Sequence, residues 1–191
     1  MAWVGDDAAR LTNGAGRRSS AEESAERVIG LTRLRLDRLR IGSMDGVEMC
    51  NNATHLQLQH NLLTRIESLE FFSQLQFLVL SHNQIGTIEG LAHLHTLHYL
   101  DLSHNCIAEV EVGALPPNLK ALELHGNPLL DEGCAVVASA LRGGVTPSLD
   151  WIYLGRNHAS AAAVTELREQ LYSAIRARRT NQWLEGVAAA L

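Results

Sequence analysis

The stretch LVLSHNQIGTIEGLAHLHTLHYLDLSHNCI, residues 78–107, contains the phrase Leu-x-Leu-Ser-His-Asn twice. The first copy begins at Leu78 and the second begins 22 residues later, at Leu100. A repeat of this period indicates short structural units stacked one on another. The histidine and asparagine in each copy leave two alternatives, a site that carries chemistry or a structural feature of the repeat.

The repeat continues on both sides of this stretch. Steps of 22 residues give units that begin at Leu31, Ala53, Leu75, Leu97 and Leu119, and a sixth unit begins at Leu149 after eight extra residues. Positions 4, 6 and 11 of each unit are apolar. This alternation predicts a short strand over positions 3 to 7 with side chains 4 and 6 pointing inward.

We therefore predict an α/β solenoid with six parallel strands on its concave face. Units of 22 residues are too short for a full α-helix on the return, so the convex side should be 3₁₀-helical or irregular. The long fifth unit is the exception, because residues 131–141 place apolar side chains on one helical face. Helical caps are expected at both ends of the solenoid.

Position 9 of units two to six is asparagine. After each strand the backbone must turn, and an asparagine side chain offers both a donor and an acceptor to the backbone groups left there. The sequence thus predicts a structural asparagine ladder that consists of Asn61, Asn83, Asn105, Asn127 and Asn157.

The repeat arithmetic divides the chain into three parts. Residues 1–30 form a flexible N-terminal segment with a short capping helix over about 21–29, and residues 31–159 form the solenoid. Residues 160–191 form a C-terminal capping helix and tail. The apolar stripe of that helix, spaced as on one helical face, consists of Val164, Leu167, Leu171 and Ile175. Trp183 and Leu184 in the tail are candidates for docking on a partner.

Composition limits the classes of function. The 191 residues carry a net charge of −5, which argues against nucleic acid or an anionic membrane as partner. The three cysteines are far apart, as expected for free thiols in a reducing compartment. No signal peptide and no membrane span are apparent, and we expect a cytoplasmic protein.

The histidines at position 8 form a row in this arrangement, namely His60, His82 and His104. Such a row, with His125 one position earlier in its unit as the candidate fourth ligand, could ligate zinc only if the nitrogens converged. Side chains on a regular ladder instead run parallel. Stacked imidazoles should instead resist joint protonation, which lowers their pKa values. Ser-His neighbours on a strand point to opposite faces and cannot act as nucleophile and base. We expect no catalytic residues, no metal, no cofactor and no enzymatic activity.

The exposed strand positions are the predicted site. They are Arg33, Arg35, His55, Gln57, Phe77, Val79, Tyr99, Asp101, Glu123, Trp151 and Tyr153. Phe77, Val79 and Tyr99 would form an apolar centre, with arginines towards one end and acids towards the other. Exposed aromatic side chains are enriched at interface hot spots, and a charge gradient would orient a helix or extended segment of another protein. The alternative is that flanking chain covers some of these side chains, above all Trp151 and Tyr153.

The segment RIESLEFFSQLQFLVLSHNQIGTIEGLAHLHTLHYLDLSHNCI resembles the phosphatase-1 regulatory subfamily of leucine-rich repeat proteins. Within that subfamily the chain resembles small ciliary and axonemal members, in the stretch RLDRLRIGSMDGVEMCNNATHLQLQHNLLTRIESL and in the motif LPPNLKALELHGNP. The resemblance implies a non-enzymatic adaptor or structural subunit of a large assembly, such as the axoneme of a cilium or flagellum. A regulatory subunit of a protein phosphatase is the alternative, although such proteins usually have about twice as many repeats.

Overall fold

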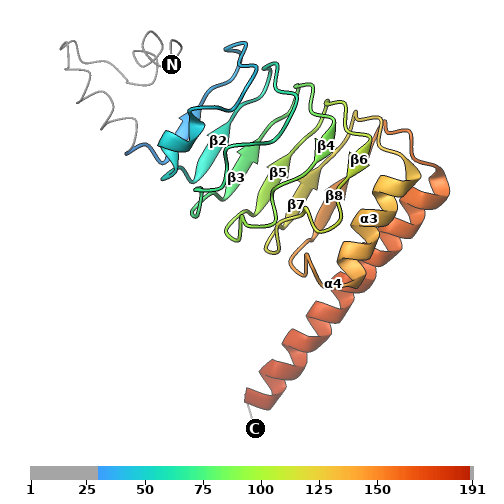
Figure 1. Cartoon of the computed structure of the whole chain (residues 1–191). Coiled ribbons are helices and arrows are strands. Elements are labelled where there is room, and N and C mark those ends of the chain that lie inside the picture. The colour runs from blue at the N-terminus through green and yellow to red at the C-terminus, as the bar shows by residue number, and fades with distance from the viewer. Residues whose placement is uncertain (1–29, 190–191) are drawn as a thin grey trace.

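The computed structural model describes residues 30–189, and within the last helix it describes side chains up to residue 182. The flexible segment and the capping helix predicted near the N-terminus lie outside these residues. The described chain winds into a solenoid, with a sheet along one side and the two α-helices at the C-terminal end (Figure 1).

Six parallel strands form the main sheet, in the order β1-β2-β3-β5-β7-β8. Their register follows the repeat, so that Phe77 pairs with Tyr99, and after the insertion Ala121 pairs with Trp151. The predicted solenoid with six parallel strands is confirmed. The strands are β1 (Arg33–Arg35), β2 (His55–Gln57), β3 (Phe77–Val79), β5 (Tyr99–Asp101), β7 (Ala121–Glu123) and β8 (Trp151–Tyr153).

Each strand is shorter than predicted. It covers positions 3 to 5 of its unit, whereas the prediction was positions 3 to 7. Hydrogen bonds to the next unit continue past the strand, since Leu80 N–H donates to the Asp101 carbonyl at 2.8 Å and His82 N–H donates to the Ser103 carbonyl at 3.0 Å. Position 8 adopts a left-handed backbone in every unit, and the chain turns there. The φ angles there are 61° at Arg38, 58° at His60, 56° at His82, 53° at His104, 71° at Gly126 and 57° at Arg156.

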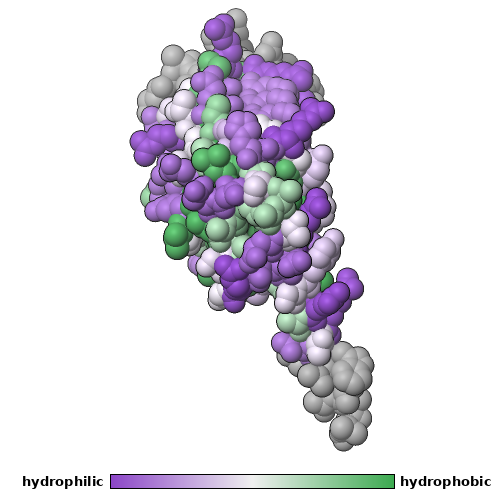
Figure 2. Space-filling model, turned by 90° about the vertical axis from the view of Figure 1, so that its right-hand side faces the viewer, coloured by the Kyte–Doolittle hydropathy of each residue, from purple (hydrophilic) through white to green (hydrophobic). Residues whose placement is uncertain are grey.

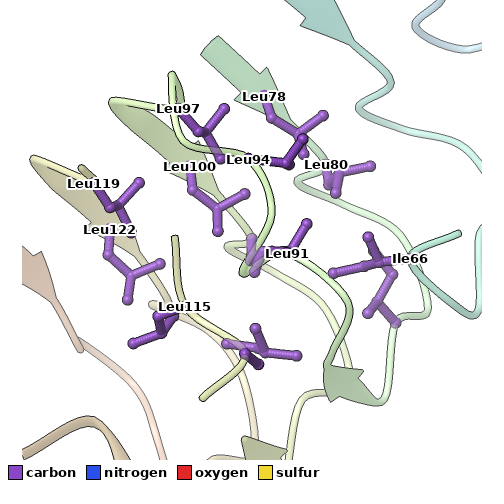
Figure 3. Packing of buried hydrophobic residues seen from close by; sticks show 14 of the residues in the cluster. Ile66, Leu78, Leu80, Leu91, Leu94, Leu97, Leu100, Leu115, Leu119 and Leu122 are labelled. Carbon is purple, nitrogen blue, oxygen red and sulfur yellow. The ribbon is translucent and has the colours of Figure 1, made fainter. Parts of the chain in front are cut away.

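The core is a stack of aliphatic side chains from successive units. Leu78, Leu100 and Leu122 come from three neighbouring strands, and none of them is exposed. Leu91 and Leu94 reach the same core from the returning chain (Figure 3). Burial of one such side chain contributes about 1.5–3 kcal/mol, so the repeat holds the solenoid together along its whole length.

The convex side differs in part from the prediction. Unit one does contain a 3₁₀-helix, η1 (Val47–Cys50), but units three and four pair through a second, two-stranded parallel sheet. Its strands are β4 (Thr87–Ile88) and β6 (Glu109–Val110). These segments occupy the same positions of equally long units and are rich in β-branched residues, which favours pairing.

Two α-helices lie side by side at the C-terminal end of the solenoid (Figure 1). The helix predicted in unit five is confirmed as α3 (Asp131–Arg142), which ends before the left-handed Gly144 at φ 68°. The second helix, α4 (Ala161–Ala189), packs against α3 and extends beyond the solenoid. Leu167 and Leu171 of the predicted stripe are buried, and Val164 and Ile175 are half-buried.

Asp131 connects the beginnings of these two helices. Ser160, just before α4, donates to the Asp131 carboxylate through its amide at 2.6 Å and its hydroxyl at 2.8 Å. The backbone hydrogen bond from Ser160 is the main reason why the pKa of Asp131 lies below its usual value. No helix within residues 30–189 combines the length and the hydropathy needed to cross a lipid bilayer.

Candidate functional site

The predicted site residues project from the concave face of the sheet. Positions 3 and 5 alternate with the buried positions 4 and 6, so their side chains point to the opposite side. Arg33, Arg35, Phe77, Trp151 and Tyr153 are exposed. The half-buried members are His55, Gln57, Val79, Tyr99, Asp101 and Glu123.

Aromatic side chains form a row across the middle of this face. The His55 ring stacks on Phe77 with centroids 4.4 Å apart and an interplanar angle of 13°. Phe77 lies 6.1 Å from Tyr99 and remains 38 % exposed. The sequence places the apolar centre at Phe77, Val79 and Tyr99, and the in-register pairing of β2 with β3 extends it to His55.

A second aromatic pair lies on the last strand. The rings of Trp151 and Tyr153 are 6.0 Å apart, and the two residues are 46 % and 47 % exposed. The flanking chain therefore leaves a large part of both side chains uncovered. Tyr153 lies over Gly155, where a Cβ would come within 2.9 Å of the phenol oxygen.

Two carboxylates in register, Asp101 and Glu123, lie between these aromatic groups. The Ser103 amide and hydroxyl donate to Asp101 Oδ1 at 2.9 and 2.7 Å. The Tyr99 hydroxyl donates to Glu123 Oε1 at 2.7 Å. Burial, followed by this hydrogen bond, raises the pKa of Tyr99, so its hydroxyl stays protonated. Within the described side chains, no lysine or arginine pairs with either acid.

The basic end of the concave face carries less free charge than the sequence suggests. The Arg35 guanidinium binds the Asp37 carboxylate, and this hydrogen bond is the main reason why the pKa of Asp37 lies below its usual value. Arg33 is exposed on the same strand. The predicted gradient from basic to acidic therefore rests on Arg33 at one end and on Asp101 and Glu123 at the other.

The histidines of position 8 do form a row, and it lies beside the concave face. His60 stacks on His82 at 4.3 Å and His82 stacks on His104 at 4.4 Å, with interplanar angles of 11° and 10°. Because the rings are parallel, their nitrogens do not converge on one point. No group of three or more metal-ligating side chains capable of holding an ion occurs within the described part of the chain. Burial, followed by the neighbouring His104 and His60, lowers the pKa of His82.

His125, which the sequence places beside this row, joins the row to the last strand through a contact with Tyr153. The His125 ring lies edge-on to His104 at 4.9 Å and contacts Tyr153 at 4.6 Å. Gly126 leaves the space for this arrangement, since a Cβ there would lie 2.7 Å from His104 Nδ1. The sequence contains a signal for this contact, because unit five has glycine at position 8 and carries its histidine at position 7.

The structure places the asparagines at the turn that follows each strand. Asn105 is typical, because its Oδ1 accepts the Ile85 amide at 3.0 Å and its Nδ2 donates to the carbonyls of Leu80 and Leu102, each at 3.0 Å. One side chain thus satisfies backbone groups of two units. Asn157 makes a single such bond, to the Leu154 carbonyl at 2.8 Å, and its buried Oδ1 has no partner.

Trp183 and Leu184, the predicted docking residues, belong to the helical backbone of α4, and their side chains lie outside the described ones. An open pocket of about 350 Å³ lies near this part of α4, lined by Asp150, Ile175, Arg178, Arg179 and Gln182. Arg178 in this pocket already has partners, because its guanidinium donates hydrogen bonds to the Leu149 carbonyl at 2.7 Å and to Asp150 at 2.9 Å. These bonds attach α4 to the beginning of β8.

Comparisons with known proteins agree with this architecture. The family model "Leucine Rich repeats (2 copies)" matches residues 54–93 and 73–116. An LRR protein of Leptospira interrogans has a similar structure, with a TM-score of 0.60 and 22 % identity over 78 % of this chain and 43 % of that one. An internalin of Listeria monocytogenes gives a TM-score of 0.56 and 25 % identity over 67 % of this chain and 36 % of that one. No curated protein matches the sequence.

The chain thus spans less than half the length of both solved structures. The fold and the repeat register are those of a leucine-rich repeat solenoid, and the family model matches two overlapping stretches within residues 54–116. Proteins of this class generally mediate protein–protein interactions and are typically not enzymes, and their extended curved surface carries the binding.

Proposed function

We propose that this protein is a non-enzymatic adaptor or structural subunit that binds another protein through its concave face. One observation carries the proposal, namely that rigid aromatic side chains stand exposed in register on that face. Phe77, Trp151 and Tyr153 are 38 %, 46 % and 47 % exposed. Apolar side chains gathered on an exposed surface usually mark an interaction site. Aromatic anchors of this kind are typical of interface hot spots.

The partner that fits this face is a helix or an extended segment with both apolar and basic side chains. The aromatic row would contact its apolar side. Asp101 and Glu123 hold hydrogen bonds from Ser103 and Tyr99, and His125 Nδ1 lies 3.5 Å from Glu123 Oε2. Neither acid pairs with a lysine or arginine within the described side chains, so such a residue of the partner would complement them. Arg33 at the other end of the sheet would favour an acidic end of the same segment.

The assembly that we propose is the axoneme of a cilium or flagellum, and we propose that the protein is cytoplasmic. This step is supported by the resemblance of residues 35–69 and of the LPPNLKALELHGNP motif to small ciliary leucine-rich repeat proteins.

The test is a tagged pull-down from ciliated cells with crosslinking mass spectrometry. The site variant combines Phe77→Ala with Trp151→Ala and keeps Tyr99, because the Tyr99 hydroxyl binds Glu123. The matched control combines Phe71→Ala with Tyr172→Ala, two aromatic side chains off this face that are 67 % and 61 % exposed. Circular dichroism first verifies that both variants are folded.

Axonemal proteins recovered by the wild type and the control, and lost by the site variant, would support both parts of the proposal. The same partners retained by the site variant would overturn the concave face as the binding surface. A phosphatase catalytic subunit as the main partner would replace the axonemal assignment with a regulatory one.

A further inference from the structure

Strand β8 is the outer edge of the main sheet within the described chain. In each earlier unit the amide of position 6 donates to the next strand, as Leu124 does to the Tyr153 carbonyl at 2.9 Å. The amide of position 8 does the same, as Gly126 does to the Gly155 carbonyl at 2.8 Å. The corresponding donors of the last unit belong to Leu154 and Arg156, and no described strand lies beyond them.

The core of the last unit is also open on this side. Leu122 and Leu124 of β7 and its turn are fully buried, whereas the equivalent Ile152 and Leu154 are only partly buried. The helix α4 packs against α3, and Arg178 of this helix donates hydrogen bonds to Leu149 and Asp150, just before β8. Figure 2 looks onto this end and shows hydrophobic residues in the middle of the face, surrounded by hydrophilic ones.

This edge lacks the features that usually prevent pairing. Sheet edges are commonly protected by a lysine or proline within the strand, by a bulge, or by a covering loop. The sequence of β8, Trp-Ile-Tyr, has high strand propensity and no charge. The nearest charged residues are Asp150 before it and Arg156 after it.

We propose that β8 pairs antiparallel with β8 of a second copy of this chain, around a two-fold axis at Tyr153. In this register Asp150 lies opposite Arg156 of the second copy, and Ile152 lies opposite Leu154. The pairing therefore brings opposite charges together at both ends and closes the open core in the middle. A two-fold interface requires this kind of self-complementary surface.

The backbone fits the same register. Alternate residues of a strand point their hydrogen-bonding groups to the same side, so the outward donors at Leu154 and Arg156 place the groups of Ile152 outward as well. Antiparallel strands exchange their hydrogen bonds between such residues. Tyr153 then faces Tyr153 of the second copy in a pair without hydrogen bonds, and Trp151 faces Gly155, over which the Tyr153 ring of that copy lies.

The consequence is a single curved sheet that joins the concave faces of both copies. The two Trp151–Tyr153 pairs would meet at its centre. One strand on each side buries a small area, so the dimer should be weak and concentration-dependent. Asp150 keeps its bond to Arg178, and Arg156 of the second copy adds a second cation to the exposed side of that carboxylate.

A disulfide tests this register directly. Residues that face each other in a pair without hydrogen bonds have Cα atoms about 4.5 Å apart, which a disulfide spans. Tyr153→Cys is made with Cys106→Ser, because Cys106 is the exposed thiol and Cys50 and Cys134 are buried. Mild oxidation should give a covalent dimer. Gln57→Cys in the same background is the control, since it occupies the same position of the interior strand β2.

Sedimentation provides the second measurement. The full chain should dimerise reversibly, and at about 0.3 mM a complex with Kd ~10 µM would be mostly formed. Tyr153→Lys places two like charges opposite each other and should abolish the dimer, while Phe77→Lys on an interior strand should leave it intact. The proposal is overturned if the chain stays monomeric and Tyr153→Cys crosslinks no faster than Gln57→Cys, or if Tyr153→Lys leaves the dimer unchanged.

Discussion

At the scale of single residues, the turn after each strand depends on a pair of positions. Position 8 is left-handed in all six units, although five of them carry arginine or histidine there and not glycine. A left-handed backbone costs a residue with a side chain about 1–2 kcal/mol. Position 9 follows at once, and its asparagine ties this turn to the neighbouring unit. The side chain at position 9 therefore stabilises the backbone that position 8 must adopt.

Replacing one of these asparagines should destabilise the protein strongly. In Asn105→Ala the Ile85 amide and the carbonyls of Leu80 and Leu102 lose a buried partner. We expect the free energy of unfolding to fall by about 2–4 kcal/mol, measured by urea denaturation. Cys106→Ala, at the exposed neighbouring position, should stay within about 0.5 kcal/mol of the wild type.

The same substitution at Asn157 should have a smaller effect, because that side chain holds one backbone bond and has an unpaired Oδ1. An equal loss of stability in Asn157→Ala and Asn105→Ala would show that the hydrogen bonds between units are not the source of the effect.

Gly126 gives a second prediction at this scale. Alanine there must adopt a φ of 71° and place its Cβ 2.7 Å from His104 Nδ1. Gly126→Ala should lower the free energy of unfolding by about 1–2 kcal/mol, whereas Gly86→Ala, with no atom within 4 Å of the new Cβ, provides the control. His104→Ala should relieve the steric part of the cost, so the double variant should lose less than the sum of the single ones.

At the scale of elements, the in-register strands create rows that no single unit contains. The stacked histidines are the clearest row, and His82 has a ring on both sides. Protonation of this central ring is opposed by burial first and then by His104 and His60, with Asp101 acting in the opposite direction. The pKa of His82 should therefore lie below 6.5 in the folded protein, as an NMR titration would show.

The consequence for stability follows from the direction of this shift. The unfolded chain binds the proton more tightly, so His82 makes the fold less stable as the pH falls from above 6.5 through the lowered pKa. His104→Ala should raise the pKa of His82 towards 6.5, and His158→Ala, outside the row, should leave it unchanged. A titration of His82 that does not respond to His104→Ala would contradict the role of stacking.

The elements also show how far sequence reasoning reaches. The period of Leu78 and Leu100 predicts the strands, their register and the concave positions, because parallel pairing needs only equal spacing. The helix α3 follows from the apolar side chains at Cys134, Val137 and Leu141. The short strands β4 and β6 were missed, since a two-residue segment carries too little pattern. The bonds from Ser103 to Asp101 and from Arg35 to Asp37 depend on side-chain conformations that periodicity does not contain.

At the scale of the whole molecule, the solenoid is a one-dimensional stack in which each unit contacts only its neighbours. Interior units have a neighbour on both sides, and their leucines are fully buried, as at Leu100. Within the described chain the last unit has a neighbour on one side, with Ile152 and Leu154 partly exposed. Stability should therefore be greatest in the middle and decline towards this end.

This gradient can be measured by hydrogen exchange with mass spectrometry. Leu100→Ala removes a side chain from the middle of the core and should cost about 2–5 kcal/mol, with faster exchange in all the strands. Ile152→Ala removes a side chain from the last unit and should cost less. In this variant the faster hydrogen exchange should be confined to β8 and α4. These two elements are the last of the stack, since β8 pairs with β7 and α4 packs against α3. Equal acceleration in β3 and β5 would mean that the solenoid unfolds as one cooperative unit and that its last repeat is not a separately frayed end.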